Sequence, residues 1–137
     1  MRTYETDFLG WTEDTASAIE EGRWSEIDVA SLVDEVRSLG RQERSRMQST
    51  LTVVFHHLLK ERFQPTKRSR SWTLTIEEHR TRAQELLAES PSLKQVLSNL
   101  TCRAYRTARL RAARETGLDL ATFPAANPFT DSDIWGS

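Results

Sequence analysis

Apolar residues recur at steps of three and four along most of the chain, a spacing that predicts α-helices. The most regular run spans 42–63, and one face of it carries Met47, Leu51, Val54, Phe55, Leu58, Leu59 and Phe63. Gln64 and Pro65 follow, and a residue that precedes proline disfavours helical backbone angles. We therefore expect a helix over 42–63 that ends at Gln64.

Two helices are predicted ahead of this run. The first covers about 5–21, ends at Gly22, and places Phe8, Trp11, Ala18 and Ile19 at helical spacings. The second begins at Ser25 or Asp28, because either side chain can cap a helix. Gly40 is expected to end or kink it. Its predicted inner face holds Leu32, Val33, Val36 and Leu39.

Two helices are predicted after the central run. The fourth starts either at Ser71 or with Thr75 and Glu78 as a capping box, and its stripe holds Trp72, Ile76, His79, Ala83, Leu86 and Leu87. Ser90 and Pro91 begin the fifth, which ends near 116 before Gly117. Its inward residues are Leu93, Val96, Leu97, Leu100, Ala104 and Ala108.

The chain after these helices is irregular. Thr130 can cap one short terminal turn, and four apolar residues favour a tail that packs down: Phe123, Phe129, Ile134 and Trp135. A length of 137 residues suits one domain, and only 5 glycines and 4 prolines argue against the many turns of a β fold. We predict an all-α, single-domain bundle over 1–137, with about five helices and an irregular tail at 125–137.

Composition restricts the location and the chemistry. The one cysteine, Cys102, cannot form a disulfide within the chain or a cysteine-rich zinc site. The N-terminus lacks the basic and then apolar pattern of a signal peptide, and no apolar run is long enough to cross a bilayer. We expect a cytoplasmic protein without a membrane partner.

Charge is distributed unevenly along the chain. Residues 1–59 carry 6 basic and 11 acidic residues, residues 60–114 carry 13 and 5, and residues 115–137 carry 0 and 4. An acidic segment therefore lies on either side of a basic one. These segments can neutralise each other in the fold, which we favour, or the basic one can form a face for an anionic partner.

No catalytic residue, metal site or cofactor is predicted. His56 and His57 are adjacent and point about 100° apart on a helix, so at most one of them can share a metal with His79. Cys102 is predicted to face outward without a neighbouring base. The glycines are scattered and form no phosphate-binding loop.

The basic residues around position 68 are the best candidates for binding. Lys67, Arg68, Arg70 and Ser71 precede or begin a predicted helix, and helix N-termini attract anions. On the fifth helix a basic stripe is formed by Arg103, Arg106 and Arg114. The alternative is that these arginines pair with Asp34 and Glu35. Trp72 is interpreted as a core residue rather than a platform for stacking bases.

Several segments resemble one bacterial family, abundant in cyanobacteria and catalogued as domain of unknown function 29. They are "YETDFLGW" near the start, "VDEVRSLGRQE" at 33–43, "HHLLKERFQP" at 56–65, "RSRSWTLTI" at 68–76, "SPSL" at 90–93 and "ETGLDLATFP" at 115–124. The resemblance implies an all-α fold and brings no activity or cofactor. One departure is His79, where the family tends to have glutamine.

The sequence favours a non-catalytic cytosolic helical module that binds another protein. The alternative is a protein that binds nucleic acid or another anion through its basic 60–114 segment. A metal-dependent hydrolase is a third reading. The oligomeric state stays open, and a homo-oligomer is among the alternatives.

Overall fold

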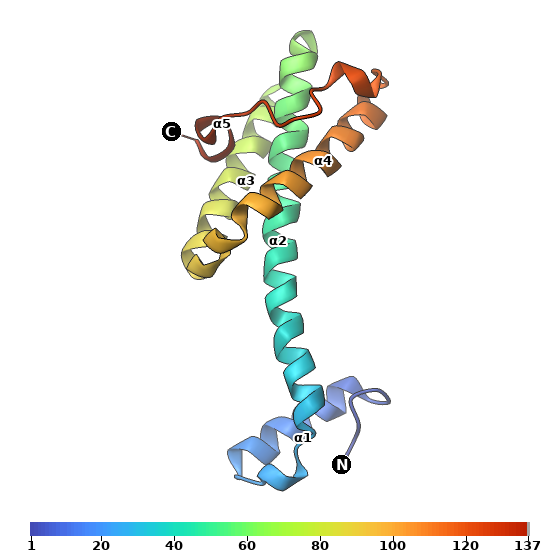
Figure 1. Ribbon diagram of the computed structural model, residues 1–137, viewed down its shortest axis with the longest axis vertical. Coiled ribbons are helices and arrows are strands. Elements are labelled where there is room, and N and C mark those ends of the chain that lie inside the picture. The colour runs from blue at the N-terminus through green and yellow to red at the C-terminus, as the bar shows by residue number, and fades with distance from the viewer. Residues whose placement is uncertain (137) are drawn as a thin grey trace. The chain divides into compact units, whose positions relative to one another are not determined.

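The computed structural model describes residues 1–136, and all regular secondary structure in that range is helical. Its five α-helices are α1 (Phe8–Glu20), α2 (Val29–Phe63), α3 (Arg70–Glu89), α4 (Leu97–Thr116) and α5 (Asp131–Trp135), shown in Figure 1. Four short 3₁₀ turns lie between them: Trp24–Glu26, Pro65–Lys67, Pro91–Gln95 and Leu120–Thr122. The prediction of an all-α fold is confirmed.

Contacts within the chain define two compact units, Met1–Arg41 and the part that begins at Gln42. We call them the N-terminal unit and the C-terminal unit and describe each by itself. The first turns of α2 belong to the N-terminal unit and the rest of that helix to the C-terminal unit. That the whole chain is one domain stays a prediction.

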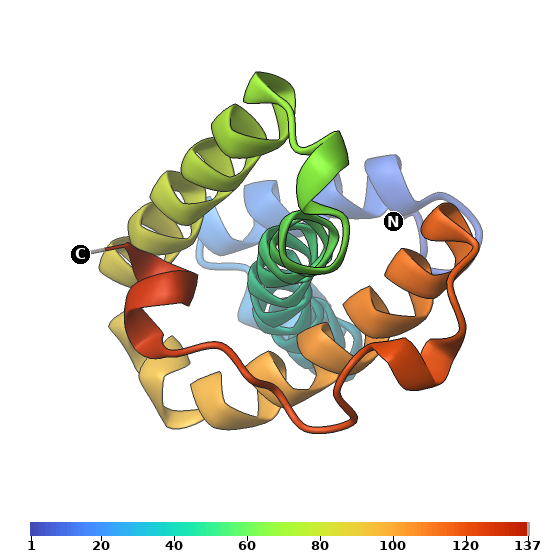
Figure 2. The same ribbon diagram turned by 90° about the horizontal axis from the view of Figure 1, so that it is seen from above.

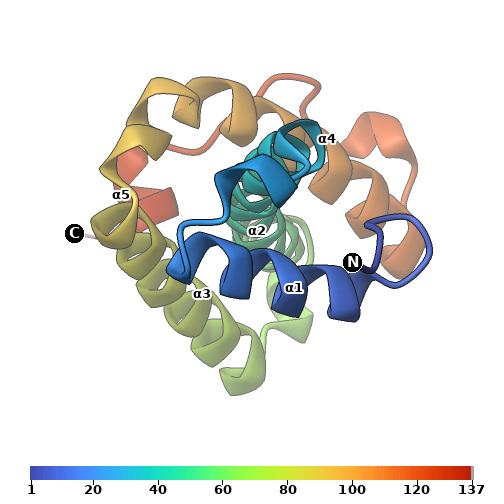
Figure 3. The same ribbon diagram turned by 90° about the horizontal axis from the view of Figure 1, so that it is seen from below.

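In the N-terminal unit, α1 lies across the first turns of α2 (Figure 3). Asp7 caps α1 by accepting a hydrogen bond from the Gly10 N–H at 2.9 Å. Gly22, with φ of 69°, turns the chain after α1 through a conformation that favours glycine. Asp28, rather than Ser25, starts α2, because its carboxylate accepts from the Ser31 N–H at 3.2 Å.

Helix α2 continues through Gly40, so the prediction of two separate helices is wrong. A glycine inside a helix costs only about 1 kcal/mol relative to alanine. The residues on either side are strong helix formers, and the apolar stripe of 47–59 anchors the helix in a packed core. Tertiary packing therefore outweighs the local penalty of Gly40.

In the C-terminal unit, α3 and α4 lie on different sides of α2 and the tail crosses between them (Figure 2). The core is built from the α2 stripe and the facing sides of α3 and α4. Phe55 is fully buried, and its ring centroid lies 5.5 Å from that of Tyr105 and 6.0 Å from that of Phe129. Aromatic pairs at these separations contribute beyond the area they bury.

The start of α3 and the start of α4 both differ from the sequence prediction. Ser69, not Ser71 or Thr75, caps α3, because its hydroxyl accepts from the Trp72 N–H at 3.2 Å. Pro91–Gln95 forms a 3₁₀ turn, and α4 begins only at Leu97. The end of α4 agrees with the prediction, since Gly117 has φ of 74° and its N–H bonds back to the Ala113 carbonyl.

The tail packs onto the C-terminal unit as predicted. Thr130 and Asp133 form a reciprocal capping box at the start of α5. Phe123, Phe129 and Ile134 are buried. Arg109 on α4 holds the tail by donating to the carbonyls of Phe123 at 3.0 Å and Leu120 at 3.1 Å.

Candidate functional site

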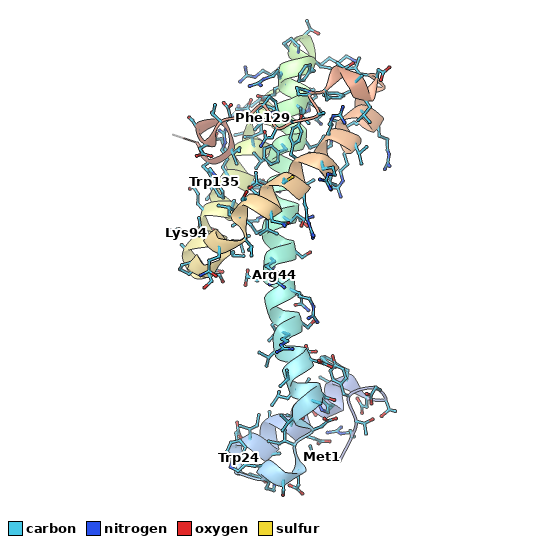
Figure 4. The ribbon with its side chains drawn as sticks, in the orientation of Figure 1. Met1, Trp24, Arg44, Lys94, Phe129 and Trp135 are labelled. Atoms are coloured by element: carbon cyan, nitrogen blue, oxygen red, sulfur yellow. The ribbon has the colours of Figure 1, made fainter. Side chains whose placement is uncertain are left out.

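The N-terminal unit exposes large apolar side chains that the sequence pattern assigned to its interior. Val33, Val36 and Leu39 were expected on the inner face of their helix, but they are 40%, 59% and 58% exposed, while Leu32 is half-buried. Seven exposed residues of the two helices form what we call the N-terminal apolar face: Phe8, Leu9, Ile19, Val29, Val33, Val36 and Leu39. Trp24, in the turn between the helices, is also exposed (Figure 4).

Helix geometry groups the three valines on one side of α2, and Phe8 and Ile19 on one side of α1. Val29, Val33 and Val36 are separated by steps of four and three, the spacing of a seam between packed helices. Gly40 continues this seam, and a Cβ atom placed there would meet nothing within 4 Å. On α1, Phe8 and Ile19 are eleven residues apart, about three turns, so they share one side. Trp11 and Ala18 occupy the neighbouring buried side.

Charged residues border this face with opposite signs. Glu20 follows Ile19 on α1, and Arg37 follows Val36 on α2. Both are exposed, and neither forms an ion pair with another residue of the N-terminal unit. The unit as a whole carries 4 basic and 10 acidic residues, a net charge of −6.

The predicted anion-binding residues lie around the start of α3. Lys67 ends the preceding 3₁₀ turn, and Arg70 and Ser71 are the first two residues of the helix. All four predicted residues are exposed. Arg68 lies near a carboxylate, with Nε 3.5 Å from Glu61 Oε1. The four residues are therefore close together along the chain and open to solvent, with Arg68 already partly neutralised.

The predicted basic stripe lies on the outer side of α4. Arg103, Arg106 and Arg114 are exposed, and their spacing places them on one side with the exposed Leu110 between them. None of the three arginines has a carboxylate within 4.0 Å in residues 42–136. The alternative, a pairing of these arginines with Asp34 or Glu35, stays a prediction. Within the N-terminal unit Asp34 is exposed and Glu35 accepts from the Tyr4 hydroxyl at 3.0 Å.

A groove of about 950 Å³ runs beside this stripe, between α4 and the tail. Its lining includes Cys102, which is exposed as predicted, and the body of Tyr105. Arg106 lines the groove and also belongs to the basic stripe. Lys94 and Trp135, labelled in Figure 4, line it from the 3₁₀ turn before α4 and from α5.

A buried lysine forms a cluster that the sequence pattern did not reveal. Lys60 on α2 is 4% exposed, and its Nζ lies 3.0 Å from Glu115 Oε1 on α4 and 4.6 Å from the centre of the Trp72 ring on α3. We call Lys60, Glu115, Trp72 and His56 the Lys60 cluster. Its members come from α2, α3 and α4. These contacts stabilise the charge of Lys60, because a buried ammonium requires a carboxylate and gains from an aromatic face.

The two histidines at this position are half-buried. His56 Nε2 lies 2.6 Å from Glu115 Oε2, although the two groups are not aligned as a hydrogen bond. Burial lowers the pKa of His56 below its ordinary value, against the opposing effect of Glu115. Burial also lowers the pKa of His57, whose Nδ1 lies 2.9 Å from the Val53 carbonyl. The hydrogen bond from Lys60 lowers the pKa of Glu115.

Trp72 is not the core residue that its stripe predicted. It is half-buried, lies outside the buried cluster around Phe55, and covers the Lys60 ammonium. His79 is half-buried as well, and its Nδ1 lies 2.9 Å from the Thr75 carbonyl of its own helix. Both side chains therefore make their contacts within the C-terminal unit.

Position along the chain explains why the Lys60 cluster was missed. Its members come from residues 56–60, 72 and 115, and only the packing of three helices brings them together. One local signal existed, since His56 and Lys60 are four residues apart and therefore share a side of α2. In residues 1–136 no group of three or more His, Cys, Asp or Glu side chains could hold a metal ion.

Fold and surfaces together define an all-α protein with exposed apolar side chains on one unit and exposed basic side chains on the other. A family model described as "Domain of unknown function DUF29" matches residues 3–136, and the chain belongs to this family. The family resemblance of the sequence is thereby confirmed. No curated protein and no solved structure matches the chain. Among residues 1–136 there is no helix with the length and apolar character that a membrane span requires.

Proposed function

We propose that the protein is a non-catalytic interaction module that docks another protein chain on its N-terminal apolar face. The observation that carries this proposal is the exposure of seven large apolar side chains within two helices of a 41-residue unit. A concentration of exposed apolar side chains is typical of sites for protein binding. A cytoplasmic location is part of the same proposal.

Site-specific photocrosslinking in the cells that make the protein tests this proposal. A photoreactive amino acid at Val36, which is 59% exposed, should yield covalent adducts with a protein chain. The matched control is the same group at Leu74, an equally apolar side chain on α3 that is 55% exposed. Equal labelling at both positions, or no adduct at Val36, would contradict docking at this face.

The alternative is an anion- or nucleic-acid-binding protein. The observation that favours it is that Arg103, Arg106 and Arg114 are exposed on one side of α4 without ion pairs in residues 42–136. Unpaired arginines in a row suit a chain of phosphates. The groove beside Arg106 adds apolar lining that a nucleobase can contact.

Binding of a labelled single-stranded RNA, measured by fluorescence anisotropy at several salt concentrations, tests this alternative. Removal of each arginine that neutralises a phosphate should reduce the slope of log affinity against log salt by roughly 0.7. The triple change of Arg103, Arg106 and Arg114 to Ala should therefore reduce it by about 2, and the change of Arg68 and Arg70 to Ala by about 1. No binding at low salt would exclude this function.

A further inference from the structure

The N-terminal unit is too small to be complete by itself. Units of about 40 residues generally need disulfides, metals or association with another chain, because they bury too little apolar surface. The only buried apolar side chains among its 41 residues are those of Trp11 and Ala18. The chain has one cysteine, and no metal-binding group lies in residues 1–136. Besides the continuity of α2 into the C-terminal unit, association is the stabilising device that remains.

The exposed apolar residues are concentrated in this unit. Of the eleven exposed large apolar residues, nine lie between Met1 and Leu39, and only Leu74 and Leu110 lie in the C-terminal unit. The seam of Val29, Val33 and Val36 is spaced to receive the side chains of another helix. The open space above Gly40 extends the surface that a packing helix can approach. The surface is thus shaped for a helical partner.

The charges at its borders have an arrangement that a symmetric contact can use. A two-fold symmetric contact places the same surface on both partners, so that a residue i of one copy meets a residue j of the other and the reverse. Such a contact gains specificity when its borders are self-complementary. The N-terminal apolar face meets this condition, because it has Glu20 on its α1 border and Arg37 on its α2 border. Neither charge is neutralised within its own unit.

We propose that a second copy of this chain covers the N-terminal apolar face in a two-fold symmetric dimer, with Glu20 of each copy beside Arg37 of the other. The inference rests on the proposed function, since it names the chain that docks there. In this dimer each copy packs α1 against α2 of its partner. The apolar face supplies the free energy of association, and the border pairs select the orientation.

Light scattering of the full chain after size-exclusion chromatography is the first test. The native chain should elute with twice its mass of 15.8 kDa. Val36→Lys should give the monomer mass with an unchanged far-UV circular dichroism spectrum, because the residue is exposed. Leu74→Lys, the matched control, should remain dimeric. A native chain that is monomeric at high micromolar concentration, or a dimer that only Leu74→Lys disrupts, would overturn the proposal.

A charge exchange tests the partner's identity more sharply. Glu20→Arg alone and Arg37→Glu alone should each weaken the dimer on the order of tenfold, because each creates two like-charge contacts. An equimolar mixture of the two variants should recover the native affinity. In that mixed dimer both contacts again join opposite charges, which a pairing of Glu20 with Arg37 inside one chain cannot produce. Failure of the mixture to recover overturns the proposed contact.

The outcomes also separate this inference from the proposed function. A monomer that forms adducts through Val36 with a different protein would overturn the dimer and leave the docking role intact. A monomer without adducts at Val36 would overturn both. An adduct at Val36 of twice the chain mass supports both.

Discussion

The two parts of α2 carry the same apolar pattern and meet different surroundings. In the C-terminal unit Met47 and Leu51 are completely buried in a core shared with α3, α4 and the tail, and Val54 is completely buried as well. In the N-terminal unit Val29, Val33 and Val36 are 40–62% exposed, although they continue the three- and four-residue spacing. Periodicity therefore identifies the apolar side of a helix and says nothing about which chain covers it.

The largest difference between the units should appear when a core aromatic residue is removed. Phe55→Ala should lower the free energy of unfolding by about 3–5 kcal/mol, because it leaves a cavity beside Tyr105 and Phe129. Val36→Ala, measured by urea denaturation at a concentration that keeps the chain monomeric, should change it by less than about 0.5 kcal/mol. A cost above about 1 kcal/mol for Val36→Ala in the monomer would mean that its own chain covers it.

The next largest effect concerns the Lys60 cluster. Glu115→Gln removes the carboxylate that lies 3.0 Å from the buried Lys60 ammonium. Because hydrogen bonds to charged groups contribute about 1.5–3 kcal/mol, the substitution should lower the free energy of unfolding by about that amount. Glu78→Gln is the control, because it removes an exposed pair with Arg82 and should change the free energy of unfolding by less than about 0.5 kcal/mol. Equal effects of the two substitutions would show that water solvates the Lys60 ammonium well enough without the Glu115 carboxylate.

Local features of the fold could be predicted from the sequence better than long-range ones. Caps and helix ends were largely accessible, as Thr130, Asp28 and Gly117 show, because their signals lie within four residues. The start of α3 was missed because several hydroxyl residues compete there, and the side chains of Ser69, Ser71 and Thr75 can each cap a helix. The continuity of α2 was missed because a glycine locally favours the end of a helix, whereas the packing that keeps α2 helical comes from residues further along it. The first is a competition among local signals, and in the second tertiary packing outweighs a local signal.

The candidate surfaces depended on information that a sequence does not contain. The exposure of Arg103, Arg106 and Arg114 follows from their side of α4, but the absence of ion partners within residues 42–136 depends on where the carboxylates fold. Burial of Lys60 depends on Glu115, which is 55 residues away. The N-terminal apolar face was assigned to the interior because an apolar stripe has the same spacing whether its own chain or another chain covers it.

A smaller effect should follow from the buried histidines. His56 and His57 have pKa values below the ordinary value of 6.5 in the folded chain, mainly because of burial. The unfolded chain therefore binds more protons just below that pH. Their contribution to stability is complete above 6.5 and is lost as the pH falls through the folded pKa values. Lys60 also disfavours their protonation, whereas Glu115 favours it.

Urea denaturation between about pH 8 and about pH 5 measures this effect. The urea concentration at the midpoint of unfolding should decrease as the pH is lowered below about 6.5. A variant with His56→Gln and His57→Gln should show a smaller decrease over the same pH interval. An unchanged profile in that variant would assign the loss to other groups. Carboxylates produce a separate loss at lower pH, because the pKa of Asp14 is lowered to about 2 by its hydrogen bonds with Arg2.

The smallest predicted effect tests the open part of α2 directly. Gly40→Ala should stabilise the monomer by about 0.5–1 kcal/mol, because alanine restricts the unfolded chain and suits a helix interior. Its Cβ would meet nothing within 4 Å, so no steric cost opposes this gain. Urea denaturation of the monomer and sedimentation of the dimer should be measured on the same variant. A stabilised monomer with weaker association would show that the partner helix approaches α2 closely at Gly40. A destabilised monomer would instead mean that its own chain packs against this glycine, and α2 would then be covered along both of its parts.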